Sequence, residues 1–177
     1  LKEEETVEAD LAFAAEYCRR QKTLFLADGN CLAMPQAKLL ALLKRIRASL
    51  PWVRRVSLYA NARDILRRSV DELRQLKGLG MSRLYMGLET GHDPTLAAIA
   101  KGSDSREMIA AGQRVREAGI FLSVSVLLGI AGRRDSQAHA RATAAVLNAM
   151  KPNQVAALTL MLLENTVSRW RDNHYRH

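Results

Sequence analysis

The chain has 177 residues, 48% of them hydrophobic and 25% charged, a composition that argues against a disordered protein and suits one folded core. Its 27 Lys and Arg against 18 Asp and Glu give a formal charge of +9, which fits an anionic partner only if the basic residues converge. The apolar runs fall well short of the roughly 20 residues that cross a bilayer, so we expect no membrane span and a cytoplasmic protein.

Helix-like and strand-like stretches alternate along the chain. In chain order we predict a helix over 5–20, a strand over 23–27, a helix over 35–50, a strand over 53–59, a helix over 69–78, a strand over 83–88, a short helix over 93–99, a helix over 104–119, a strand over 121–128, a helix over 135–150 and a strand over 155–163. Helix starts are marked by Pro35 in a first turn, by a capping box of Ser69 with Glu72, and by Asp93 and Asp135 as caps.

The spacing of these elements predicts the fold class. Strand starts recur at roughly 30 to 40 residues, the length of successive βα units with right-handed crossovers, so we expect an α/β protein with parallel strands. The continuous apolar run over 121–128 is typical of a strand covered on both faces. Because a helix opens the chain, its first strand is expected to be missing, which would leave the strand at 23–27 with an unpaired edge and favour self-association.

Basic residues and cysteines carry weaker signals. Most Lys and Arg fall at helix positions where we expect solvated faces: Lys44, Arg45, Arg47, Arg67, Arg68, Arg74, Arg114 and Arg116. Cys18 is expected to be a buried apolar residue inside the first helix, and Cys31 an inert thiol near a loop. Their separation matches no common zinc or cluster spacing.

Polar residues and glycines follow each predicted strand. They are Asp28, Gly29 and Asn30, then Asn61, then Glu89, Thr90 and Gly91, then Gly129 and Gly132, and last Glu164, Asn165 and Thr166. Loops that follow parallel strands open on one face, so we expect these groups to converge in a polar-ligand cleft. Asp28 and Glu89 are acceptors suited to an amine or to ribose hydroxyls. Taken singly, each segment also fits an ordinary turn. We expect His92 to be a loop residue and not a base or a metal ligand.

Three of these strand ends resemble the radical S-adenosylmethionine (SAM) superfamily. They are Phe25-Leu26-Ala27-Asp28-Gly29-Asn30, then Tyr85-Met86-Gly87-Leu88-Glu89-Thr90-Gly91-His92-Asp93 with Lys101-Gly102 downstream, and Ser123-Val124-Ser125-Val126-Leu127-Leu128-Gly129. The resemblance spans about residues 5–166 and implies a partial (β/α) TIM-like barrel. It also implies SAM and a 4Fe–4S cluster as cofactors of the full-length protein, which reductively cleaves SAM to a 5′-deoxyadenosyl radical.

The resemblance also assigns site residues by position. It places Asp28, Gly29 and Asn30 at the methionyl amine of SAM, Asn61 at a further polar contact, Glu89 at the ribose, and Gly129 beside adenine. The sequence has no Cys-x3-Cys-x2-Cys motif, so neither the cluster nor catalysis is expected in this chain alone. We therefore expect an incomplete barrel core over 1–166 and a disordered basic tail over 167–177.

Two other functions fit the sequence less specifically. One is a noncatalytic barrel-like module that binds RNA or another anion through its basic surface. The other is a fragment of an ordinary TIM-barrel enzyme in which Asp28 and Glu89 act as an acid/base pair. The sequence does not define the substrate of any of these.

Overall fold

Five parallel strands form one open sheet in the computed structural model, which describes residues 2–27 and 29–161. The strands are β1 (Thr23–Leu26), β2 (Arg55–Tyr59), β3 (Met81–Glu89), β4 (Phe121–Leu128) and β5 (Gln154–Thr159). They lie side by side in chain order, and every neighbouring pair is parallel. The predicted α/β fold with parallel strands is confirmed, and the open sheet corresponds to part of a TIM-like barrel.

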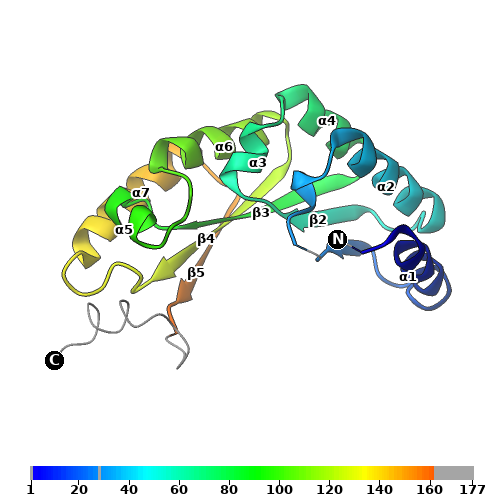
Figure 1. The fold of residues 1–177 in the computed structure, drawn as a ribbon, viewed down its shortest axis with the longest axis horizontal. Helices are drawn as coiled ribbons and strands as arrows, with labels where there is room; N and C mark the ends of the chain where they lie inside the picture. Colours follow the sequence, from blue (N-terminus) through cyan, green and yellow to red (C-terminus); the bar gives the residue numbers. More distant parts are fainter. Residues whose placement is uncertain (1, 28, 162–177) are drawn as a thin grey trace.

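Helices connect the strands and cover one face of the sheet. They are α1 (Glu4–Tyr17), the 3-10 helix η1 (Cys31–Ala33), α2 (Gln36–Ser49), α3 (Ala62–Leu66), α4 (Val70–Gly78), α5 (Asp93–Ala98), α6 (Ser105–Glu117) and α7 (Ser136–Met150). The sheet is arched, with the helices of its crossovers on the convex side and no helix across the concave side of the part shown as ribbon (Figure 1). None of the helices within the described ranges is long and apolar enough to span a membrane.

The predicted helix-start signals differ in outcome. Pro35 stands at the N-cap of α2 and not in its first turn. The capping box is formed: the Ser69 side chain accepts from the Glu72 N–H, and the Glu72 carboxylate accepts from the Ser69 N–H. Asp135 stands at the predicted cap of α7, but its side chain makes no capping bond, which corrects that expectation. Asp93 is the first residue of α5 rather than its cap, and its carboxylate accepts from both the N–H and the hydroxyl of Ser105.

Alternation along β3 divides its side chains between the two faces of the sheet. Leu84, Met86 and Leu88 are fully buried beneath the helices, whereas Arg83 and Tyr85 between them are only half-buried. Along β4, Leu122, Val124 and Val126 are buried in the same way and Ser123 is buried as well, whereas Phe121, Ser125 and Leu127 are half-buried. The expectation of a strand covered on both faces is therefore wrong for most of β4. One face of each strand supplies the core, and the other supplies the concave surface.

β1 forms one edge of the sheet. It pairs only with β2, through four residues, and no strand of the described part lies on its other side. The unpaired edge that the sequence predicted is therefore present. The helix α1 packs against α2 beside this edge, and the buried Leu11 belongs to the common core. Self-association through the edge stays a prediction.

Candidate functional site

The loops that follow the five parallel strands open at one end of the sheet, where the sequence predicted a polar-ligand cleft. Asp28 and the residues from Glu164 onward lie outside the described part of the chain. Gly29 is exposed with a positive φ of 70°, and a Cβ there would meet nothing within 4 Å. The backbone at Gly29 is therefore accessible to a ligand.

A hydrogen bond joins the loop after β1 to the loop after β2. The Asn30 side-chain amide donates to a carboxylate oxygen of Asp64, which is buried. Asn61 caps α3, since its Oδ1 accepts from the Asp64 N–H at 2.8 Å. Asn30 Oδ1 is buried and lacks a hydrogen-bond partner among the described residues. Two predicted site residues thus meet at Asp64, a residue that the sequence reasoning missed.

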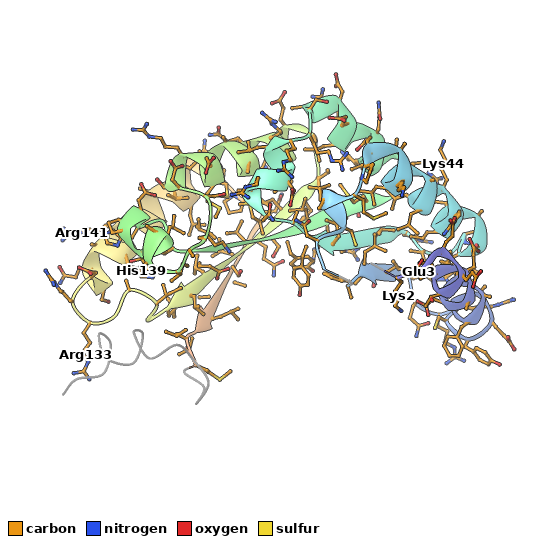
Figure 2. All side chains as sticks on the ribbon, viewed as in Figure 1. Lys2, Glu3, Lys44, Arg133, His139 and Arg141 are labelled. Carbon is orange, nitrogen blue, oxygen red and sulfur yellow. The ribbon has the colours of Figure 1, made fainter. Side chains whose placement is uncertain are left out.

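Arg68 forms hydrogen bonds with the segment that follows β1. Contrary to the expected solvated position, Arg68 is only 7% exposed. Its guanidinium donates to the carbonyls of Leu32 and Met34 and to the side-chain oxygen of Gln36. The expectation does hold for Lys44, which lies on the outer side of α2 (Figure 2). The buried position of Arg68 is stable because several oxygens accept hydrogen bonds from its charged guanidinium.

Glu89 ends β3 in the left-handed region, with φ of 61°. Its Oε1 accepts from Lys101 Nζ at 2.9 Å, and the two side chains are 24% and 22% exposed. A Cβ on Gly87 would lie 2.2 Å from this oxygen and 3.1 Å from Lys101 Nζ. Gly87 therefore leaves the space in which the Glu89–Lys101 pair lies. The other carboxylate oxygen has no hydrogen bond to a described residue and can accept from a ligand hydroxyl.

Helix α7 fixes the loop that follows Glu89. The Thr90 hydroxyl lies 2.7 Å from His139 Nδ1, and it also accepts from the His92 N–H at 3.0 Å. The Gly91 N–H donates to the Thr143 hydroxyl at 2.9 Å. Thr90, His139 and Thr143 are all buried. The loop conformation that carries Glu89 thus depends on α7.

The sequence reasoning missed His139 and Thr143. Their spacing of four residues places both on one face of a helix, which is the only signal that the sequence offers. His92, predicted to be a loop residue, caps no helix through its side chain, and its Nδ1 lies 2.9 Å from the Thr95 hydroxyl. These histidines position the backbone beside the candidate site.

Acidification should destabilise this loop. Desolvation by burial, and secondarily the charge of His92, lowers the pKa of His139 below its usual 6.5. The unfolded chain then binds more protons than the folded one as the pH falls through 6.5 toward the folded pKa, so stability is lost in that window. We expect wild type to lose more unfolding free energy between pH 7.5 and 5.5 than His139→Gln, measured by urea denaturation. Equal losses in the two proteins would contradict this role for His139.

Gly129 follows β4 in an exposed turn with a positive φ of 87°. A Cβ there would approach only Leu160 Cβ, at 3.8 Å. Ile130 beside it is buried. The structure thus brings Gly129 to the same end of the sheet as Gly29, Asn30 and Glu89.

The described residues do not fit an iron–sulfur cluster. Cys18 is half-buried at the end of α1, not buried within the helix as expected, and Cys31 is buried in η1. Among residues 2–27 and 29–161, no group of three His, Cys, Asp or Glu side chains could hold a metal ion. The unpartnered Asn30 Oδ1 and the free oxygen of Glu89 fit the polar groups of a nucleoside or an amino acid instead.

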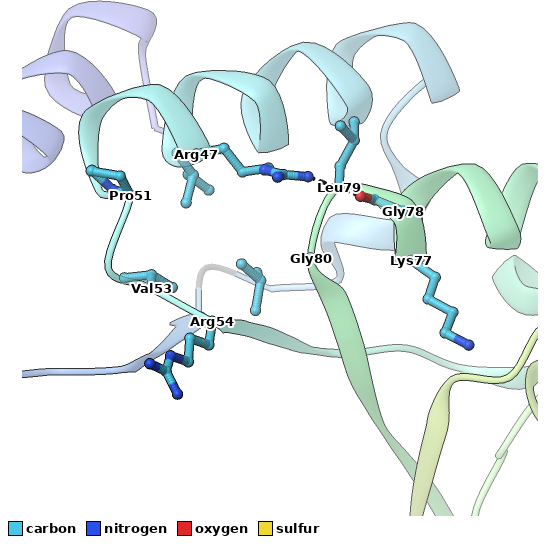
Figure 3. A pocket seen from close by; sticks show the side chains of 10 residues that line it. Arg47, Pro51, Val53, Arg54, Lys77, Gly78, Leu79 and Gly80 are labelled. Carbon is cyan, nitrogen blue, oxygen red and sulfur yellow. Dashed lines mark hydrogen bonds between the residues drawn. The ribbon is translucent and has the colours of Figure 1, made fainter.

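A cavity of about 390 Å³ lies at the opposite end of the sheet, between α2 and the start of β3. Its lining includes Arg47, Arg54 and Lys77. Arg47 donates to the Gly78 carbonyl at 3.0 Å, whereas Arg54 and Lys77 point away from the hollow (Figure 3). The cavity therefore lacks converging cations and does not resemble an anion site.

The comparisons agree with the geometry. The chain belongs to the radical SAM superfamily, whose family model matches residues 1–143. The fold is similar to coproporphyrinogen III oxidase (HemN) from Escherichia coli, with a TM-score of 0.69 and 16% identity over 98% of this chain and 42% of that one. HydG, a maturase of the FeFe hydrogenase, gives 0.62 and 20% over 92% and 37%. Methylornithine synthase (PylB) gives 0.66 and 12% over 93% and 46%.

The chain spans less than half of the length of each of these solved structures. At such low identity they show the fold alone. No curated protein matches the sequence. The family model confirms the family resemblance inferred from the strand-end residues.

Proposed function

We propose that this chain forms the SAM-binding core of a radical SAM enzyme. In the whole protein, SAM would be cleaved reductively to methionine and a 5′-deoxyadenosyl radical, which then acts on a further substrate. The observation that carries the proposal is Glu89, whose carboxylate lies over Gly87 at the end of the sheet where the loops meet. The family match supports the same reaction class.

Each predicted site residue receives a role in this proposal. Asp28, Gly29 and Asn30 bind the methionyl part of SAM, and the unpartnered Asn30 Oδ1 suits its ammonium group. Asn61 adds a polar group at the next loop. The free oxygen of Glu89 accepts from the ribose hydroxyls, and the backbone at Gly129 lies beside the adenine.

The Glu89–Lys101 pair suits a ribose acceptor. The Lys101 ammonium group donates to only one of the two carboxylate oxygens. The second oxygen then accepts from two neighbouring hydroxyls without moving the pair. The pair also holds the Glu89 side chain in one place before SAM arrives, which lowers the entropy lost on binding.

The isolated chain should not cleave SAM. A 4Fe–4S cluster of this family needs three thiolates, and the sequence contains two cysteines. A segment that bears the three cysteines would have to come from elsewhere in the whole protein. Cytoplasmic location and self-association through the β1 edge remain further proposals.

Titration of the isolated chain with SAM tests the site. We expect Glu89→Gln to weaken SAM binding by about tenfold, since a hydrogen bond to a charged acceptor contributes about 1.5 kcal/mol or more. Glu16→Gln makes the same charge change on the exposed side of α1 and should leave the affinity unchanged. Equilibrium dialysis with labelled SAM measures both.

The same preparation, supplied with iron, sulfide, SAM and dithionite under anaerobic conditions, should release no 5′-deoxyadenosine. Chromatography of the products detects this nucleoside directly. Equal SAM affinity in the wild type and Glu89→Gln, or no SAM binding at millimolar concentration, would refute the assigned site. Release of 5′-deoxyadenosine by the isolated chain would refute the proposed inactivity.

A further inference from the structure

Three aromatic rings lie together on the concave face of the sheet. They come from the three neighbouring strands β1, β2 and β3. The ring centroid of Phe25 lies 4.7 Å from that of Tyr59 and 5.6 Å from that of Tyr85, and the two tyrosine rings are 5.8 Å apart. Phe25 is 38% and Tyr59 56% exposed. We call these three residues the aromatic cluster. Their rings form an aromatic surface on the concave side, against which a ligand can pack.

Arg83 stands beside Tyr85 of the aromatic cluster and has no acidic partner among residues 2–27 and 29–161. It lies in register with Ser57 and Phe121, and its guanidinium carbon is 4.1 Å from the Phe121 ring centroid. One terminal nitrogen donates to the Tyr85 hydroxyl at 3.2 Å. The Arg83 Nε is buried with no hydrogen-bond partner, and no carboxylate of a described residue forms an ion pair with the group.

An arginine in this state requires compensation. A half-buried guanidinium loses part of its hydration, and contacts with rings replace only a fraction of that free energy. Other cations near the sheet have partners: Lys101 has Glu89, and the buried Arg68 has three oxygens. Arg83 has a second terminal nitrogen that makes no hydrogen bond with a described residue, which leaves it available to an anion from the concave side.

Small residues continue the surface from the aromatic cluster toward Glu89. Gly87, Ser125 and Ala156 lie in register across β3, β4 and β5. Along β3 the order is Arg83, Tyr85, Gly87 and Glu89. A length of roughly 20 Å of strand therefore separates Arg83 from Glu89. The small side chains of this row project little from the sheet, so a flat molecule could lie against them with one end at Arg83 and the other directed toward the candidate SAM site.

We propose that the concave face binds a ligand with a flat aromatic or conjugated body and a carboxylate. The body packs against the aromatic cluster, and the carboxylate pairs with Arg83. That this ligand is the substrate of the radical reaction rests on the proposed function, whereas its binding does not.

A pair of small probes tests the proposal in the whole chain. 2-Naphthoate and the neutral 2-naphthamide share one aromatic body and differ in charge. We expect calorimetric titration to show the carboxylate binding about tenfold more tightly than the amide, since a charge-assisted pair with arginine is worth about 1.5 kcal/mol or more. Arg83→Gln should abolish this preference and leave the affinity for the amide unchanged. Arg106→Gln, the same change at an exposed position of α6, should preserve the preference.

Tyr59→Ala provides a second variant at an exposed position, where loss of the fold is not expected. It should weaken both probes by about fivefold, because a stacked ring contributes about 1 kcal/mol. The proposal is overturned if Arg83→Gln keeps the preference for 2-naphthoate, or if neither probe binds at millimolar concentration. It is also overturned if Tyr59→Ala changes the sedimentation of the chain from dimer to monomer without affecting the probes, because the face would then be an interface between copies. SAM is absent from these titrations, so the SAM site and this site can fail separately.

Discussion

Gly91→Ala should destabilise the chain by about 2–3 kcal/mol. A Cβ at Gly91 would lie 2.5 Å from the carbonyl oxygen of Ala142 and 2.8 Å from the Cα of Thr143. Both atoms belong to the backbone of α7, which cannot move aside as the end of a side chain would. The φ of Gly91 is not positive, so the cost is steric and not conformational. Urea denaturation followed by circular dichroism gives the change in unfolding free energy.

The matched control is Gly78→Ala at the end of α4. A Cβ on Gly78 meets nothing within 4 Å, and its φ is also not positive. Alanine should be neutral there or stabilise by up to about 1 kcal/mol, because it lowers the entropy of the unfolded chain. If Gly91→Ala unfolds at the same urea concentration as Gly78→Ala, α7 does not contact the loop as closely as the structure shows. Gly91→Ala should also weaken SAM binding, since the loop carries Glu89.

Arg68→Met should cost about 3 kcal/mol of unfolding free energy, because the buried carbonyl of Leu32 and the half-buried carbonyl of Met34 lose a charged donor. Methionine retains much of the length and the apolar character of the side chain, so lost packing contributes little. Hydrogen exchange should become faster at the amides of η1, which follows the predicted methionyl-binding segment. Thermal denaturation together with exchange measured by mass spectrometry checks both effects.

Arg67→Met separates these effects from a loss of charge. The Arg67 side chain is 69% exposed, and it pairs with Asp64 at 3.1 Å. Water screens the exposed Arg67 guanidinium, and the buried Asp64 carboxylate keeps its hydrogen bond from Asn30, so this variant should lose only about 1 kcal/mol or less. A stability loss in Arg67→Met that equals the loss in Arg68→Met would show that net charge, and not the buried hydrogen bonds, is responsible.

Much of the local structure was predictable because its signals are local. The capping box of Ser69 with Glu72 fixed the start of α4 without reference to the rest of the fold. Apolar runs located all five strands. The short elements η1 and α3 were missed because three to five residues are too few to show a helical period. Asp135 failed as a cap because a suitable residue type does not ensure the capping conformation.

The candidate site was predictable only in part. The strand-end position of Glu89 follows from the βα pattern, since parallel strands place their carboxyl ends together. Its pairing with Lys101 over Gly87 involves a left-handed residue, which residue type alone does not reveal. The burial of Arg68 was mispredicted because helix periodicity does not say which loop will cover a given position.

The sequence by itself determined the order of the helices and strands, the parallel sheet and the family, because apolar period and strand-end residues are properties of short segments. Tertiary structure alone decided which charged and polar groups meet. It brought His139 to Thr90 across 49 residues, and it left Arg83 beside the rings of Tyr85 and Phe121 with no acidic partner among the described residues. The physical reason is that burial, desolvation and hydrogen-bond partners depend on neighbours in space, which only the packed fold defines.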